Sequence, residues 1–152
     1  LYLLAATLNP GITAESGEVL QQACRSAADR LSTVITGAEA HPHARYARYT
    51  LLGAAGDYEQ GIQEANAVIS GGVDDPRAWA TVGFLEAKRG NIDTAATALS
   101  KAVELSPSDA YASYTLGLVK WIQTGDALPI LPQLQRMNDY TPVDLAAAEL
   151  AF

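Results

Sequence analysis

Apolar positions recur at three- and four-residue steps over most of the chain, and short breaks rich in Gly, Asn, Asp and Pro separate these runs. The clearest pattern spans residues 76–109. Pro76 suits the first turn of a helix, because a proline there loses no intrahelical hydrogen bond. Gly90 suits the end of this helix, Asn91 the start of the next, and Pro107 the end of the second helix. The segment therefore predicts a helical hairpin.

The break between these two helices recurs along the chain. Gly56-Asp57, Gly90-Asn91 and Gly125-Asp126 follow one another at steps of about 34 residues. We expect each glycine to end one helix in the left-handed conformation and each Asp or Asn side chain to cap the next helix. No partner acid, base or metal ligand recurs beside Asp57, so the pattern favours a structural over a catalytic carboxylate. A fixed period of this length is typical of a helical solenoid.

Residues 76–109 resemble a tetratricopeptide repeat. The positions that match the pattern of this family are Trp79, Val82, Gly83, Ala95, Leu99, Ala102 and Pro107. Glu86 stands where the family usually has an aromatic residue near the end of the first helix. The resemblance implies an all-α, right-handed α-solenoid of antiparallel helix–turn–helix repeats.

The same resemblance, extended over 1–152, predicts a single domain. Leu116 and Gly117 keep the pattern in a later repeat whose turn has one extra residue. The predicted units are a degenerate repeat (1–41), a second repeat (42–75), the central repeat (76–109), a last repeat (110–142) and a closing helix or start of a further repeat (143–152). Both ends of the sequence look like helices that expect neighbours, which indicates a piece of a longer protein.

In two segments the prediction concerns which residues face the inside of the stack. In residues 42–55, a strict shift by one period places Arg45 and Arg48 in the inward positions, whereas a turn shorter by one residue places Tyr46 and Tyr49 there. The second alignment is favoured because it keeps charged side chains out of the core. In residues 17–35 the helical pattern predicts an amphipathic helix with these inward residues: Val19, Leu20, Ala23, Ala27, Leu31, Val34 and Ile35.

Composition narrows the class of function. The net charge of −7 and the ten scattered Lys and Arg residues argue against a nucleic-acid surface. No apolar run approaches the length of a membrane-spanning helix. Cys24 is the single cysteine, so the sequence has no intrachain disulfide and no multi-cysteine metal site, and a structural thiol is expected. Abundant Ala and scarce Lys hint at a bacterial source, with cytoplasm and periplasm both open for a soluble protein.

The sequence contains no phosphate-cradling glycine loop and no nucleophile elbow. His41 and His43 form the only histidine pair, and no third ligand is apparent nearby, so a polar turn is favoured over a metal site. We therefore expect no enzyme activity, no catalytic residues, no cofactor and no metal.

The resemblance implies that the first helices of the repeats line a concave groove. The groove-facing residues that we expect to contact a partner are Arg77, Thr81, Phe84, Lys88, Tyr111, Tyr114, Leu118 and Trp121. Phe84 and Tyr114 are expected to remain open, whereas Trp121 is either exposed or covered by the C-terminal helix or a later repeat. The groove lacks the asparagines with which members of the family hold peptide backbone or carboxylates.

These patterns predict a non-catalytic scaffold that binds a protein or peptide, docking a peptide or an amphipathic helix against aromatic side chains. The alternative is a repeat arm of a larger enzyme or of a bacterial envelope or secretion assembly protein, which recruits a substrate or partner for another domain. The terminal helices could also support self-association. The identity of the partner is left open.

Overall fold

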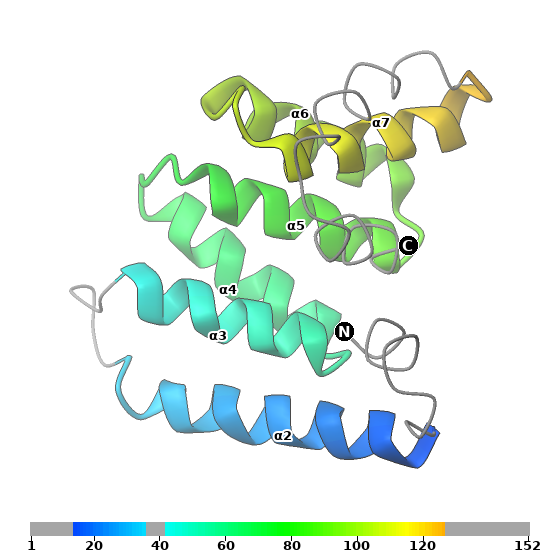
Figure 1. Ribbon diagram of the computed structural model, residues 1–152. Helices are drawn as coiled ribbons and strands as arrows, with labels where there is room; N and C mark the ends of the chain where they lie inside the picture. The colour runs from blue at the N-terminus through cyan, green and yellow to red at the C-terminus, as the bar shows by residue number, and fades with distance from the viewer. Residues whose placement is uncertain (1–13, 36–41, 127–152) are drawn as a thin grey trace.

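Six helices and no strands make up residues 14–35 and 42–126, the part of the chain that the computed structural model describes (Figure 1). The helices are α2 (Ala14–Ser32), α3 (Pro42–Ala54), α4 (Tyr58–Ser70), α5 (Pro76–Lys88), α6 (Ile92–Leu105) and α7 (Ala110–Thr124). They form an all-α helical-repeat solenoid. The helices predicted at the two ends of the sequence, and His41, lie outside the described residues.

Helices adjacent in sequence pack against each other, and α3 also contacts α5, which in turn contacts α7. The first helices of successive pairs are therefore neighbours, and the stack rises from α2 to α6 and α7 (Figure 1). The pairs α3–α4 and α5–α6 follow the same plan. Pro42 and Pro76, one period apart, each begin a helix of 13 residues.

Glycine ends the first helix of each pair. Gly56, Gly90 and Gly125 have φ angles of +84°, +83° and +72°, a conformation that only glycine adopts without strain. The backbone N–H of Asp57 then donates to the Leu52 carbonyl at 2.9 Å, which satisfies the end of α3. The N–H of Asn91 does the same for α5.

The predicted side-chain caps at Asp57 and Asn91 are wrong. Both residues stand at the N-cap position, but neither side chain accepts a hydrogen bond from the helix that follows. The Asp57 carboxylate instead pairs with Arg25, and the Asn91 Nδ2 donates to Glu86 Oε2 at 2.6 Å. The Asp57 carboxylate is therefore engaged by another helix, and the Asn91 side chain is turned back toward the end of α5. The helix that Asp126 would cap lies outside the described residues.

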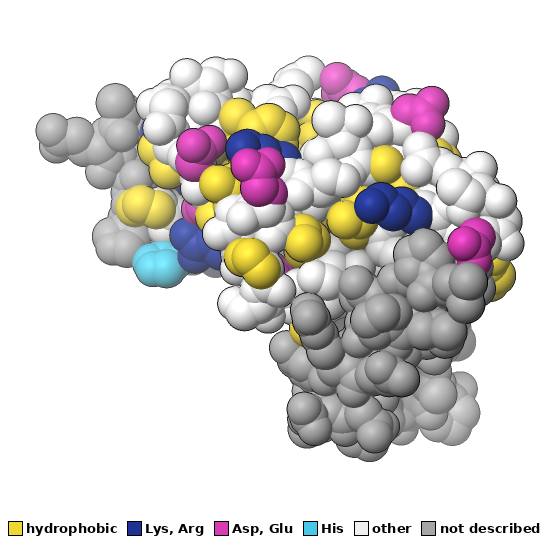
Figure 2. Space-filling view, turned by 90° about the horizontal axis from the view of Figure 1, so that it is seen from above, with side chains coloured by type: hydrophobic (Ala, Val, Ile, Leu, Met, Phe, Trp, Pro, Cys, Tyr) yellow, Lys and Arg dark blue, Asp and Glu magenta, His cyan; other side chains and the backbone are white. Residues whose placement is uncertain are grey.

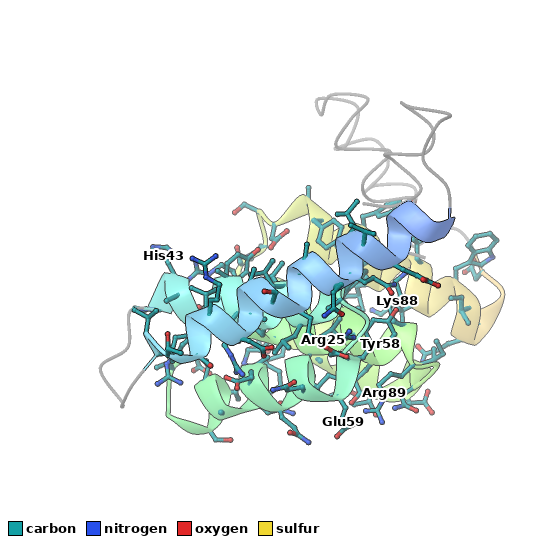
Figure 3. The ribbon with its side chains drawn as sticks, turned by 90° about the horizontal axis from the view of Figure 1, so that it is seen from below. Arg25, His43, Tyr58, Glu59, Lys88 and Arg89 are labelled. Carbon is teal, nitrogen blue, oxygen red and sulfur yellow. The ribbon has the colours of Figure 1, made fainter. Side chains whose placement is uncertain are left out.

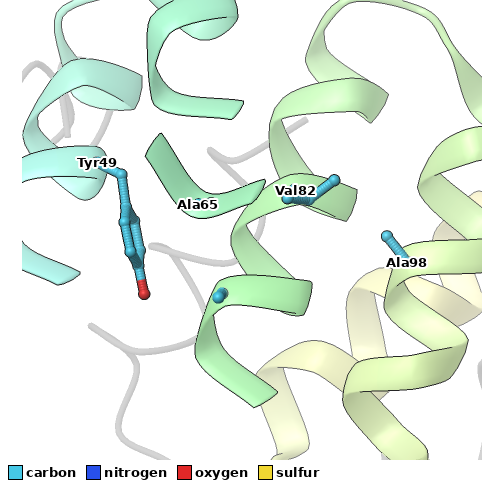
Figure 4. Packing of buried hydrophobic residues seen from close by; sticks show 5 residues of the cluster. Tyr49, Ala65, Val82 and Ala98 are labelled. Carbon is cyan, nitrogen blue, oxygen red and sulfur yellow. The ribbon is translucent and has the colours of Figure 1, made fainter. Parts of the chain in front are cut away.

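Close contact between the two helices of each pair builds the core. In α5–α6 a Cβ atom on Gly83 would lie 2.5 Å from Leu99 Cγ, so only glycine permits this approach. In α3–α4 the residues one period earlier are Tyr49 and Ala65, both buried in one cluster (Figure 4). The large side chain of this contact therefore belongs to the second helix in α5–α6 and to the first helix in α3–α4. Trp79 packs against this cluster, and Ala95 and Ala102 are also buried.

The favoured alignment of residues 42–55 is wrong in one respect. Tyr49 is buried as expected, but Tyr46 is exposed and Arg48 is buried, as the strict shift by one period predicts. Arg48 is tolerated because its guanidinium pairs with Glu64 of α4 and its Nε donates to the Ala28 carbonyl of α2 at 3.3 Å.

The inward face predicted for α2 is only partly correct. Val19, Ala23 and Val34 are exposed, and the fully buried residue of this helix is Ala28, which was not on the predicted face. The contact with α3 is therefore rotated relative to the apolar stripe. The backbone carbonyl of Ala28 accepts the hydrogen bond from Arg48 Nε.

Candidate functional site

The first helices of the pairs share a surface that we call the A-helix face. We define it by partly or largely exposed side chains of α3, α5 and α7, which are His43, Tyr46, Arg77, Phe84, Lys88 and Tyr111. Phe84 and Tyr111 join α5 to α7, with ring centroids 6.1 Å apart and a tilt of 52°. Arg77 joins α5 to α3 by contacts with Tyr46 and His43. The face is thus a continuous surface across three helices.

Arg77 is held at one end of this face. Its guanidinium forms two bonds to Asp75, from Nε to Oδ1 at 3.0 Å and from Nη2 to Oδ2 at 2.8 Å. It also lies 5.1 Å from the centre of the Tyr46 ring and contacts His43 Nδ1 at 3.3 Å. The hydrogen bonds from Arg77 hold the pKa of Asp75 below its usual value. The charge of Arg77 is therefore neutralised within the chain.

Lys88 lies at the other end of the face, one turn after Phe84. Its Nζ is 5.6 Å from the centre of the Phe84 ring. Burial lowers the pKa of Lys88. Burial, with a smaller contribution from Tyr46, also raises the pKa of Tyr111 to about 12, although this residue keeps 41 % of its surface exposed. The face thus offers aromatic rings beside a partly desolvated ammonium group.

The remaining predicted groove residues differ in how much of their surface is exposed. Thr81 and Leu118 are half-buried, and the Thr81 hydroxyl donates to the Arg77 carbonyl of its own helix at 2.8 Å. Tyr114 was expected to remain open, which is wrong: only 7 % of it is exposed, and it belongs to the core. Trp121 is 46 % exposed and its neighbour Ile122 is 55 % exposed. Figure 2 looks onto this end of the stack, where hydrophobic side chains lie among charged ones.

Apart from the A-helix face, a recess lies at the edge of the stack where the α3–α4 and α5–α6 turns come together. Its volume is about 610 Å³, and its lining includes Arg25, Asp57, Tyr58, Glu59 and Arg89 (Figure 3). Two ion pairs hold its wall together, Arg25 with Asp57 and Arg89 with Glu59. Arg25 binds Asp57 through Nε at 2.6 Å and Nη2 at 2.8 Å, and this pairing lowers the pKa of Asp57. The recess is therefore a structural junction.

Polar contacts at this edge repeat with the period of the chain. Arg25 Nη2 donates to the Ala55 carbonyl at 3.3 Å, and Arg89 Nη2 lies 2.8 Å from Glu59 Oε2. The third contact, from Gln123 Nε2 to Asp93 Oδ1, is 2.7 Å. The three contacts join residues at the same separation along the chain, and successive contacts are one period apart. We call these three contacts the edge rungs.

Sequence reasoning missed the edge rungs. The signal for them was present, because acidic Glu59 and Asp93 recur at the period, as do the long polar side chains of Arg89 and Gln123. The period was used only to align apolar and glycine positions.

Three features of the described residues concern a metal site, a membrane-spanning helix and a free thiol. In 14–35 and 42–126, no three His, Cys, Asp or Glu side chains gather closely enough to hold a metal ion. None of the helices in this part is both long and apolar enough to cross a membrane. Cys24 is a free, half-buried thiol on α2.

Residues 83–123 match the family model described as TPR repeat, which stands for tetratricopeptide repeat. These residues belong to the tetratricopeptide-repeat family. The tetratricopeptide match begins at Gly83 inside α5, covers α6 and ends one residue before the end of α7. It thus contains the Gly90 turn and the contact between Gly83 and Leu99. No curated protein matches the chain.

Tetratricopeptide repeats are commonly protein–protein interaction modules, and they are generally non-catalytic scaffolds that bind proteins or peptides. The helical-repeat structure of this chain agrees with that family. The matched residues include Phe84, Lys88 and Tyr111, so half of the A-helix face lies in the part that the family model covers.

Proposed function

We propose that this chain is a non-catalytic interaction module that binds a peptide or an amphipathic helix on the A-helix face. The observation that carries the proposal is a set of three aromatic residues on the A-helix face, in which Tyr46 of α3 and Tyr111 of α7 are exposed and Phe84 of α5 is half-buried. Exposed aromatic side chains on a rigid scaffold are frequent hot spots of binding. Because the helices hold these rings in place, a partner that docks here orders few side chains of the scaffold.

The binding mode follows from the character of the face. Apolar side chains of the partner would pack against Phe84 and Tyr111, and Tyr46 is already fixed by Arg77. An amphipathic helix supplies such side chains at steps of three and four residues, which suits a shallow surface across several helices. We assign the face to recognition because its contacts are aromatic rings packed against one another and against cationic side chains.

Selection from a library of displayed random peptides tests this proposal. A peptide selected on the whole chain is synthesised, and its Kd is measured by fluorescence anisotropy. We expect Phe84→Glu/Tyr111→Glu to weaken binding more than about tenfold, because it places charge on the apolar contact. Tyr114 is left unchanged, since it belongs to the core.

The matched control is Val73→Glu, which introduces the same charge at an exposed apolar residue between α4 and α5. It should leave the Kd within about twofold. Circular dichroism confirms that each variant keeps its helices. Equal losses for the control and the double variant, or no loss for either, would place binding elsewhere and refute the proposal.

A further inference from the structure

The Lys and Arg side chains of the described residues differ in how their charges are met. Ion pairs with a carboxylate are formed, for example, by Arg25, Arg48, Arg77, Arg89 and Lys101. Lys88 is half-buried and forms no ion pair with any residue in 14–35 or 42–126. Its contact is the face of the Phe84 ring.

This environment leaves the ammonium of Lys88 incompletely stabilised in the unbound protein. Burial lowers its pKa, which means that the charged form loses hydration. A cation over an aromatic ring recovers only part of this lost hydration at a partly exposed site. A carboxylate of a partner would supply the missing counter-charge.

Arg77 cannot take this role. Asp75 occupies its guanidinium with two bonds, and Tyr46 and His43 cover it further. Arg89 follows Lys88 directly, but it pairs with Glu59 on the other side of α5 (Figure 3). Lys88 is thus the cation of the A-helix face that remains available to a partner.

Resting on the proposed function, we propose that Lys88 binds an Asp or Glu side chain of the partner peptide, and that a large apolar side chain next to this acid packs against Phe84 and Tyr111. A single ammonium group with no second available cation fits one carboxylate. Phosphate recognition generally uses several cations or backbone N–H groups together, and this end of the face does not offer them. The partner is therefore a segment in which acidic and apolar residues adjoin.

The test uses the peptides selected on the whole chain and two lysine variants. Lys88→Met keeps most of the aliphatic stem and removes the charge, and Lys101→Met does the same on α6, where Lys101 pairs with Glu104. We expect the selected peptides to contain Asp or Glu beside a large apolar residue. Lys88→Met should raise their Kd about tenfold, and Lys101→Met by less than about twofold.

A double-mutant cycle identifies the pairing. Replacing the acid of the peptide by its amide should weaken binding to the wild type and to Lys101→Met, but have little further effect on Lys88→Met. Acylation with a trace of reagent gives a second readout, because the sequence has three lysines, Lys88, Lys101 and Lys120. Bound peptide should protect Lys88 and leave Lys101 and Lys120 unprotected.

Three results would overturn the inference in distinguishable ways. Peptides that lose affinity for Phe84→Glu/Tyr111→Glu but bind Lys88→Met and Lys101→Met equally would leave the binding face in place and remove the role of Lys88. Peptides unaffected by Phe84→Glu/Tyr111→Glu would overturn the proposed function itself. Selection of basic peptides in place of acidic ones would contradict the inference about the partner.

Discussion

The helix pairs α3–α4 and α5–α6 lie one period of 34 residues apart in the sequence. In each pair a large and a small residue meet where the two helices cross, but the helix that provides the large residue differs. In α5–α6 the first helix provides Gly83 and the second provides Leu99, whereas in α3–α4 these positions hold Tyr49 and Ala65. One pair brings a large side chain to a glycine, and the other brings a small side chain to a tyrosine. The comparison teaches that the repeat constrains the combined volume at a contact more than the residue at either position.

The largest expected effect comes from emptying the contact of α5–α6. Leu99→Ala should lower the free energy of unfolding by about 2–5 kcal/mol, because Gly83 has no side chain that could fill the cavity. Urea unfolding followed by circular dichroism measures this loss. Ser100→Ala, at the exposed neighbouring position, should change stability by less than about 0.5 kcal/mol. A loss below about 1 kcal/mol for Leu99→Ala would show that the two contacts are not complementary in volume.

A smaller effect comes from overfilling the contact of α3–α4. Ala65→Leu copies the residue of α6 into α4, where Tyr49 already occupies the space, and should cost about 1–3 kcal/mol. Tyr49→Ala creates room for the new leucine. The loss measured for Tyr49→Ala/Ala65→Leu should therefore be smaller than the sum of the two single losses, by at least about 0.5 kcal/mol. Additive losses would contradict the exchange of volumes between the two helices.

The smallest expected effect on stability concerns the N-cap residues of α4 and α5. The Asp75 side chain accepts a hydrogen bond from the Arg77 N–H at 2.9 Å and caps α5, whereas the Asp57 side chain does not cap α4. Asp75→Ala should cost about 1 kcal/mol near neutral pH. Asp57→Ala should cost less, because its partner Arg25 remains hydrated. Equal losses for the two variants would show that the cap adds nothing.

The stability lost in Asp75→Ala should depend on pH. Arg77 lowers the pKa of Asp75 in the folded state below the value of about 3.9 of an unfolded chain. The contribution of Asp75 is therefore present above about pH 4 and is lost as the pH falls through the folded pKa. Urea unfolding at a series of pH values should show the curves of the wild type and Asp75→Ala converging below about pH 4. A constant difference would mean that the carboxylate charge is not involved.

The sequence predicted those parts of the fold that depend on local backbone chemistry. The turns at Gly56, Gly90 and Gly125 need a positive φ, which glycine adopts without strain, so the spacing of these glycines was sufficient to place the turns. Burial of Arg48 could not be predicted, because it depends on Glu64 from another helix and on the Ala28 carbonyl from a third. The residues of one helix do not indicate which partners approach from elsewhere in the stack.

The candidate site was predictable to a similar degree. The resemblance to the tetratricopeptide family placed Phe84, Lys88 and Tyr111 on one face, and in the structure Phe84 contacts both Lys88 and Tyr111. The same resemblance also placed Tyr114 there, although it is buried. Tyr114 lies three residues after Tyr111, and which side of such a stripe faces the neighbouring helices depends on the rotation of α7 in its packing. The period of a pattern does not determine that rotation.

The edge rungs have a mechanical consequence for the stack. All three lie along the side where the helical turns come together, and each ties the second helix of one repeat to the end of the first helix in the next. Bending that spreads this side must stretch the rungs, whereas bending the opposite way leaves them slack, so the chain should resist the two deformations unequally. Because the Arg89–Glu59 rung is an exposed ion pair, high salt should soften the first deformation. Small-angle X-ray scattering of the wild type and Arg89→Met, at low and high salt, would show a salt-dependent curvature that the variant lacks.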